Sequence, residues 1–328
     1  MRNTQSTLGC KFYIIRILTT MRIFNKEKCT RLFTLTLLMI KGLVMVNTAN
    51  SSPYFGVDID LHNVGVDIRV NDIPTYFDYT KGQLTVEIPV PESIIDGLNK
   101  LSLSAFLPIN TKEYEDGAYA TATLFQQDLS SEASNKVKLL SVMLRMNGGK
   151  VFAEIEDYAN NQKSSPTVSL SKNKSVSIEL STTIKSPFPK WVWQDGLPIK
   201  NNQTNFNSLM NTYKEIHSTL KIKNIKKLER HYAMRAKEIA IAYNLTGENE
   251  GLKKLSVGKD MMDQSLELYD LRIDDMNLEV LANGKLARIR DDQFNAQPIF
   301  YYDNKADLLH IYKFMFYLNK DNQWIMIR

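Results

Sequence analysis

The chain has 328 residues, 43% of them hydrophobic and 23% charged, which suits two domains with ordinary cores and excludes wholesale disorder. The formal net charge is +5, but residues 1–49 carry eight basic residues and one acid, so residues 50–328 carry a net charge of −2. The basic character therefore belongs to the N-terminus, and we expect no nucleic-acid partner for the folded part.

Residues 1–49 have the pattern of a secretory signal peptide, with a basic start, an apolar region and small residues at the cleavage point. Read from Met21, which we favour as the true start, "LFTLTLLMI" follows basic residues and Ala49 is a candidate for the last residue removed. Lys41 interrupts the apolar residues, and 32–46 is shorter than the roughly 20 residues of a membrane span. We expect a periplasmic or secreted protein with no stable span. An uncleaved anchor and a buried helix are the alternatives.

Both cysteines, Cys10 and Cys29, precede residue 50, so cleavage would leave no thiol for a disulfide, a metal site or catalysis. The four histidines lack the short spacing of a zinc site, and no Gly-x-Ser-x-Gly or phosphate-loop motif is present. We therefore expect no catalytic residue, no metal and no cofactor.

Residues 50–188 alternate apolar and polar side chains with the period of a half-buried strand. In "GVDIDLHNVGVDIRVNDI" the apolar positions begin with Val57, Ile59 and Leu61. "MNGGK" at residues 146–150 predicts a hairpin, because Asn and Gly accept the positive φ of a tight turn. Turn residues separate the strands at intervals typical of an antiparallel β-sandwich, which we assign to residues 50–188.

Three prolines and a polar end mark "SPFPKWVWQDGLPIKNNQTN", and we expect residues 189–205 to link two domains. Trp191 and Trp193 alternate within it, which in an extended chain places both indoles on one side. An exposed tryptophan pair suits sugar stacking or a protein-binding hot spot, and both are candidate binding residues. The alternative is that they fill the junction between the domains.

After residue 206 the apolar residues take a helical period, and then strands return. The predicted helices are a first through Leu209, Tyr213, Ile216 and Leu220, a second over 226–245 with Gly247 as its stop, and a third, weaker one over 250–264. A hairpin at Asn283-Gly284 and a turn in "NKDNQ" follow, with "LLHIYKFMFYL" as one strand. We assign residues 206–328 to an α+β domain, a helical hairpin packed on a curved antiparallel sheet.

Aromatic residues crowd the predicted final sheet, and at alternate positions they share one face. They are either ordinary core or the lining of a pocket. The candidate binding residues among them are Tyr301, Tyr312 and Phe314.

Two regions resemble known folds. Residues 67–106 resemble the jelly-roll (galactose-binding-like) sandwich modules often attached to glycoside hydrolases, through Val70, Asn71, Gly97, Asn99 and Leu101, although Asp72 stands where glycine is usual. The order of elements in the C-terminal half, ending in "NQWIMIR", resembles the nuclear transport factor 2-like (cystatin-like) fold, which implies a cone-shaped pocket without choosing an activity.

The overall organisation, an export signal followed by two domains, is similar to that of bacterial envelope-toxin immunity proteins. We therefore expect an exported, non-enzymatic binding protein with a protein partner in the cell envelope, whose specific role is toxin neutralisation. A carbohydrate-binding accessory protein is the first alternative. An enzyme or small-ligand binder that uses the C-terminal pocket is the second.

Overall fold

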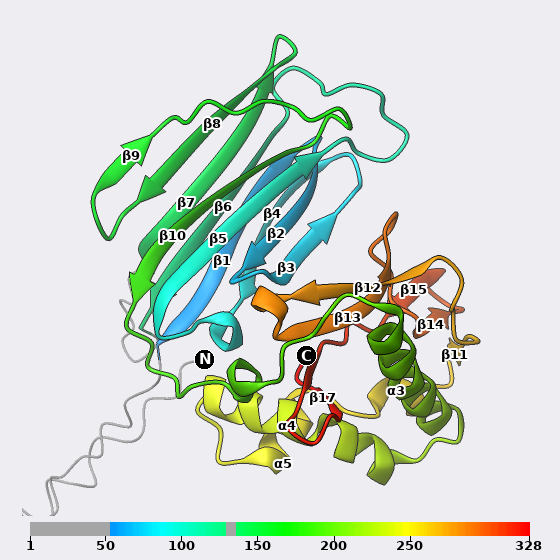
Figure 1. Ribbon diagram of the computed structural model, residues 1–328. Helices are drawn as coiled ribbons and strands as arrows, with labels where there is room; N and C mark the ends of the chain where they lie inside the picture. Colours follow the sequence, from blue (N-terminus) through cyan, green and yellow to red (C-terminus); the bar gives the residue numbers. More distant parts are fainter. Residues whose placement is uncertain (1–52, 129–135) are drawn as a thin grey trace, which may run out of the picture. The chain divides into compact units, whose positions relative to one another are not determined.

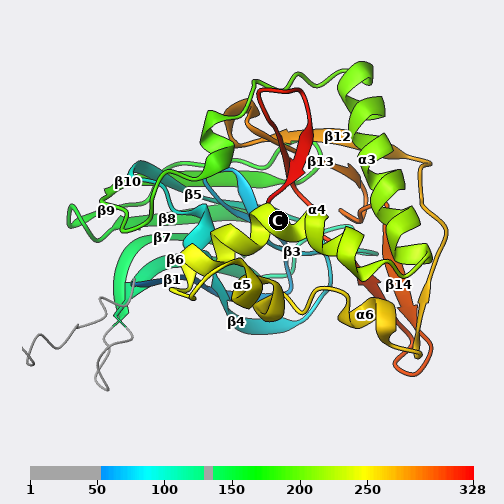
Figure 2. The same ribbon diagram turned by 90° about the horizontal axis from the view of Figure 1, so that it is seen from below.

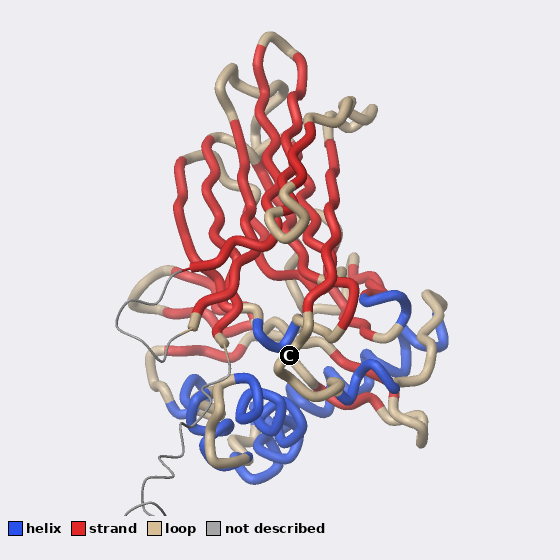
Figure 3. The backbone as a smooth tube through the Cα atoms, turned by 90° about the vertical axis from the view of Figure 1, so that its left-hand side faces the viewer, coloured by secondary structure: helices blue, strands red, loops and turns tan. Residues whose placement is uncertain are grey.

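The computed structural model describes residues 53–128 and 136–328, and Ser51–Arg328 forms one compact unit. The signal peptide predicted for residues 1–49, with Met21, Lys41 and both cysteines, lies outside the described residues. The described chain consists mainly of antiparallel sheets, and its α-helices belong to the C-terminal half (Figures 1 and 3). This confirms the predicted β-rich first part and the later mixture of helices and strands.

A six-stranded antiparallel sheet has the order β4-β1-β6-β7-β8-β9. Its strands are β1 (Tyr54–His62), β4 (Gln83–Pro89), β6 (Tyr119–Gln127), β7 (Lys136–Asn147), β8 (Lys150–Asp157) and β9 (Gln162–Ser164). Val57, Ile59 and Leu61 of β1 are buried, and the residues between them point to the opposite face, as the alternation predicts.

A four-stranded antiparallel sheet has the order β10-β5-β2-β3. Its strands are β2 (Gly65–Val70), β3 (Ile73–Asp78), β5 (Gly97–Phe106) and β10 (Val176–Ile184), and the 3-10 helix η2 (Pro91–Ser93) precedes β5. Leu101, Leu103 and Ala105 of β5 are buried in the same hydrophobic core as the inward side chains of β1. Leu98 and Lys100 point the other way, to the outer face of this sheet.

The helical hairpin consists of α3 (Gln203–Lys221) and α4 (Ile225–Ala242), which pack against each other. An asparagine caps each helix: the Asn202 and Asn224 side chains accept hydrogen bonds from Asn205 N and Lys227 N. Helix α3 contacts β12 and β13 (Figure 2), and α4 contacts β17. Among residues 53–128 and 136–328, no helix has the length and apolar character needed to cross a membrane.

Two predictions about the helices were wrong. Helix α4 ends at Ala242, and Asn244 adopts the left-handed conformation at φ 52°, so an asparagine takes the role we gave to Gly247. Gly247 precedes the next helix instead. The predicted third helix is two short ones, α5 (Glu248–Lys254) and α6 (Lys259–Met262), because Gly258 at φ 81° turns the chain between them.

Two antiparallel sheets complete the C-terminal part, with the orders β12-β13-β16-β17 and β11-β14-β15. The strands are β11 (Leu266–Leu268), β12 (Met276–Leu281), β13 (Leu286–Asp291), β14 (Phe300–Asp303), β15 (Leu308–Ile311), β16 (Phe316–Leu318) and β17 (Trp324–Met326). The predicted hairpin at Asn283-Gly284 is confirmed: both residues have positive φ, within the short 3-10 helix η4 (Ala282–Gly284).

The strand predicted over "LLHIYKFMFYL" is two strands in two different sheets. The chain leaves β15 after Ile311, and the backbone N–H of Phe314 donates to the side-chain oxygen of Gln297 at 2.8 Å. A side chain thus takes the place of a strand partner, and β16 begins at Phe316 on the other sheet.

Candidate functional site

The four-stranded sheet is joined to the C-terminal part by an ionic cluster around Glu279 of β12. The Arg69 guanidinium of β2 contacts Glu279 at 2.8 Å, and the guanidinium groups of Arg288 and Arg290 contact it from β13. Burial alone would raise the pKa of Glu279, but the three guanidinium groups outweigh it and lower the pKa to about 2. The carboxylate therefore stays charged and holds the two parts of the chain together.

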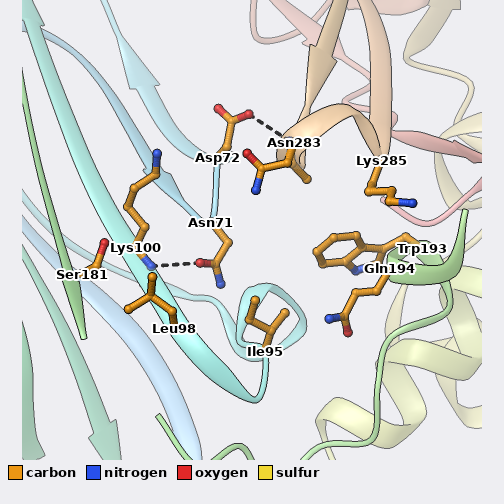
Figure 4. Close-up of a pocket in the computed structure, with 11 residues that line it drawn as sticks. Asn71, Asp72, Ile95, Leu98, Lys100, Ser181, Trp193, Gln194, Asn283 and Lys285 are labelled. Atoms are coloured by element: carbon orange, nitrogen blue, oxygen red, sulfur yellow. Dashed lines mark hydrogen bonds between the residues drawn. The ribbon is translucent and has the colours of Figure 1, made fainter. Parts of the chain in front are cut away.

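The turn between β2 and β3 supplies the second connection. Asn71 and Asp72 adopt positive φ there, a conformation that asparagine and aspartate tolerate better than other side-chain-bearing residues. The Asp72 carboxylate accepts a hydrogen bond from Ala282 N at 2.9 Å, and the Asn71 side-chain oxygen accepts one from Lys100 N (Figure 4). The Asn71 amide nitrogen donates to the side-chain oxygen of Asn99. Both side chains are thus engaged in fixing the turn against its neighbours.

Residues 192–195 form the 3-10 helix η3 (Val192–Asp195), so the extended chain expected around the tryptophan pair does not occur. Trp191 is 1% exposed, and its indole N–H donates to the carbonyl oxygen of Ile94 at 2.7 Å. Trp193 is 4% exposed. The exposed-pair interpretation therefore does not hold: both indoles are interior and lie where η2 and the C-terminal part meet. Their role in binding stays a prediction.

An open groove of about 430 Å³ lies along this junction. Its walls come from the β2–β3 turn, the start of β5, η3 and η4 (Figure 4). Trp193 and Gln194 line one side, and Leu98 and Lys100 line the other. The Leu98 side chain is 65% exposed, which is high for a leucine that borders a cavity.

The groove holds polar groups that the fold does not use. Within the described residues, the Asn283 and Ser181 side chains and the amide nitrogen of Gln194 make no hydrogen bond to protein, whereas the Gln194 oxygen accepts from Trp191 N. The buried indole N–H of Trp193 has no partner either. An aliphatic surface with amide and hydroxyl groups beside it can bind a chain that offers both apolar side chains and peptide groups.

The other predicted binding residues come together away from the groove. Tyr312 packs against Tyr301 and Phe314, with ring centroids 5.8 and 5.3 Å apart. Tyr301 and Phe314 are 3% and 1% exposed and belong to the C-terminal hydrophobic core. Their burial agrees with the alternative that these aromatic residues are ordinary core and not the lining of a pocket. The Tyr312 hydroxyl donates to Asp260 of α6 at 3.1 Å, and burial raises the pKa of Tyr312. No sequence signal identified Asp260, because it lies in the poorly predicted third helix.

Apart from Trp193, the residues that line the groove were also missed. The sequence linked Asn71 to the jelly-roll resemblance and marked Asn283 as a turn residue, but it gave no sign that these two turns contact each other. Leu98 follows the strand alternation on the outer face and carries no signal of its own. In the described part of the chain, no three His, Cys, Asp or Glu side chains are grouped to hold a metal ion.

Comparison with protein-family models, with curated proteins and with solved structures finds no match to this chain. The assignment of the site therefore rests on its geometry.

Proposed function

We propose that this protein is a non-enzymatic binding protein whose partner is another protein, and that the junction groove receives a segment of that partner. The observation that carries the proposal is the groove itself, with Leu98 exposed on one wall and unengaged amide groups on the others. A protein segment offers the apolar side chains and peptide groups that such a surface complements.

The burial of Trp193 favours a protein ligand over a carbohydrate. Sugar rings stack on the open face of an aromatic side chain, and an indole that is 4% exposed presents little of that face. The most exposed apolar side chain that lines the groove is the aliphatic Leu98. The carbohydrate-binding alternative therefore has less support than the protein-binding one.

The walls of the groove are held in place before any partner arrives. Asp72 is bonded to Ala282 N, Asn71 to the β5 backbone, and the Lys285 ammonium group to the carbonyl oxygen of Gly196 at 2.7 Å. A surface fixed in advance loses little conformational entropy on binding, which favours affinity. This rigidity suits recognition of one defined partner.

The finer fold assignment and the compartment belong to the same proposal. We take the six- and four-stranded sheets as the two layers of a β-sandwich, supported by their common core, and the C-terminal part as nuclear transport factor 2-like, supported by a helical hairpin packed on a sheet. The jelly-roll resemblance stays a prediction. Export rests on the pattern in residues 1–49, and toxin neutralisation in the envelope is the specific role that we propose for the binding.

Affinity capture in the native host tests the proposal. We would purify tagged wild-type protein, the Leu98→Asp variant and the Phe152→Asp variant from the envelope fraction and quantify co-purifying proteins by mass spectrometry. Phe152 of β8 is a matched control, because its side chain is also apolar and exposed (53%) but does not line the groove. We expect one stoichiometric protein with the wild type and the control, and at least about tenfold less with Leu98→Asp, since a central hot-spot residue contributes about 2 kcal/mol or more.

Three results would contradict the proposal. Equal recovery of the partner with both aspartate variants would place binding elsewhere on the molecule. Retention of cell-wall glycan without a protein would favour the carbohydrate-binding alternative. An activity lost on substitution of Asp260 or Tyr312, with binding unchanged, would favour the enzyme alternative in the C-terminal part.

A further inference from the structure

The turn between α3 and α4 carries two exposed isoleucines. Ile222 is the C-cap of α3 and is 66% exposed, and Ile225 is the first residue of α4 and is 37% exposed. Figures 1 and 2 show this turn on the opposite side of the C-terminal part from the six-stranded sheet. Neither isoleucine lines the junction groove, so the turn is a separate surface.

Basic side chains accompany the two isoleucines. Residues 221–230 hold five basic residues against one acid, Glu229. Lys223, Lys226 and Arg230 are exposed, and none of the three makes an ion pair with another described residue. The turn is therefore a local cationic surface, although residues 50–328 as a whole carry a net charge of −2.

The other two basic residues of the turn have acidic partners. The Lys221 ammonium lies 3.8 Å from the Asp270 carboxylate, and the Lys227 ammonium lies 2.9 Å from the Glu215 carboxylate. These two lysines are already compensated, so the unpaired positive charge of the surface comes from the other three.

The backbone of the turn is closed by hydrogen bonds at the end of α3. Asn224 N donates to Thr219 O at 3.1 Å, and Lys223 N donates to Leu220 O at 3.0 Å. Lys223 has a φ of 54°, in the left-handed conformation that glycine usually takes at the end of a helix. A lysine at this position lowers the stability of the turn relative to glycine and adds a cation between the two isoleucines.

This composition fits a lipid surface better than a protein surface. A solvated corner accounts for the lysines but gives no reason for two exposed isoleucines beside them. Lysine is depleted in protein–protein interfaces, where aromatic residues and arginine are enriched. At an anionic bilayer, by contrast, apolar side chains enter the boundary between headgroups and acyl chains while basic side chains contact the lipid phosphates.

We propose that the α3–α4 turn docks the protein on the surface of an anionic phospholipid membrane. Ile222 and Ile225 enter the headgroup boundary, and the three unpaired cations contact phosphate groups. The charge of these side chains complements the negative lipid surface. The contact is peripheral and differs from a membrane-spanning segment.

The binding should be reversible and should depend on salt. One basic residue near an anionic surface strengthens binding about fivefold, so three of them give roughly a hundredfold preference over a neutral surface. Salt screens this attraction between exposed charges. Binding at the junction groove uses other residues, so the two proposals succeed or fail separately.

Co-sedimentation with lipid vesicles tests the proposal on residues 50–328. This chain holds the whole compact unit Ser51–Arg328 and omits the apolar residues 32–46, which would attract lipid by themselves. The vesicles are phosphatidylcholine alone or phosphatidylcholine with about 30% phosphatidylglycerol, at low and high salt. We expect the wild type to bind the anionic vesicles about a hundredfold more strongly than the neutral ones at low salt, and to lose most of this preference at high salt.

Lys223→Gly separates lipid binding from folding. It should weaken binding to anionic vesicles about fivefold, yet it should not lower the melting temperature, because glycine is favoured at this φ. Lys174→Gly is the matched control, because Lys174 also has a positive φ (53°), its loss changes the net charge equally, and it lies in the loop before β10.

Ile222→Ser tests the apolar contact. It should weaken binding to anionic vesicles about tenfold, because an isoleucine that enters the headgroup boundary leaves water. Val137→Ser is the control, because Val137 is a branched apolar residue of β7 that is 58% exposed away from the turn. It should leave vesicle binding unchanged.

A wild type that binds neutral and anionic vesicles equally, or binds neither, overturns the proposal. Equal losses in Lys223→Gly and Lys174→Gly, or in Ile222→Ser and Val137→Ser, also overturn it, because the contact must then lie elsewhere. If the wild type ignores both kinds of vesicle and Lys223→Gly instead loses an acidic protein that co-purifies with the wild type, that protein occupies the turn and membrane docking is rejected.

Discussion

Replacing Glu279 by glutamine should lower the free energy of unfolding by about 3 kcal/mol at pH 7. Glu279 is 12% exposed and contacts three guanidinium groups, which lower its pKa from the usual 4.5 to about 2 against the opposing effect of burial. At about 1.36 kcal/mol for each pKa unit, this difference corresponds to roughly 3 kcal/mol. The figure agrees with the usual cost of about 3–5 kcal/mol for breaking a buried ion pair by removing one partner.

The loss of stability in Glu279→Gln should depend on pH. Because the pKa of Glu279 is lower in the folded protein, the unfolded chain binds the proton first as the pH falls. The stabilisation is complete above about pH 4.5 and disappears as the pH falls through about 2. The difference between wild type and Glu279→Gln should therefore fall to less than half by about pH 3.

Urea unfolding followed by tryptophan fluorescence at the two pH values measures both effects. Glu179→Gln is the control, because Glu179 pairs with Lys100 but is 63% exposed, and its loss should cost less than about 0.5 kcal/mol. A loss below about 1 kcal/mol at pH 7 for Glu279→Gln, or an equal loss at both pH values, would refute the account of the junction.

Two further substitutions test the packing. Trp191→Phe removes the indole N–H that donates to Ile94 O in the interior, so it should lower the free energy of unfolding in urea by about 1–3 kcal/mol. Trp324→Phe is the control and should cost less, because its indole hydrogen bond is exposed. Equal losses in the two variants would contradict this. Gly251→Ala would place a Cβ 2.0 Å from the carbonyl oxygen of Ala236. This overpacking should destabilise the fold by about 1–3 kcal/mol and lower the melting temperature. An unchanged melting temperature would contradict this and show that α5 can move away freely.

Local patterns predicted the elements whose structure is decided locally. The β7–β8 hairpin turns at Gly148 and Gly149, whose φ values are 56° and 71°. Glycine adopts such positive φ values without help from residues elsewhere in the chain. The buried face of α3 follows from the spacing of its apolar residues in the same way. In both cases the relevant interactions join residues close together in the sequence.

The junction could not be predicted, because its contacts join residues far apart. Arg69 and Glu279 are 210 positions apart, and so are Asp72 and Ala282. The break between β15 and β16 has a similar cause: the period of two continues through the segment, but Gln297 takes the N–H of Phe314. A pattern of hydrophobicity carries no information about such a partner.

Site-specific photo-crosslinking in the native host tests whether a partner protein binds in the groove. A photo-reactive amino acid would replace Leu98 in one protein and Phe152 in another, both at exposed apolar positions. We predict one discrete covalent adduct with a protein at position 98 and none at position 152. No adduct at position 98, or the same adduct at both positions, would contradict it.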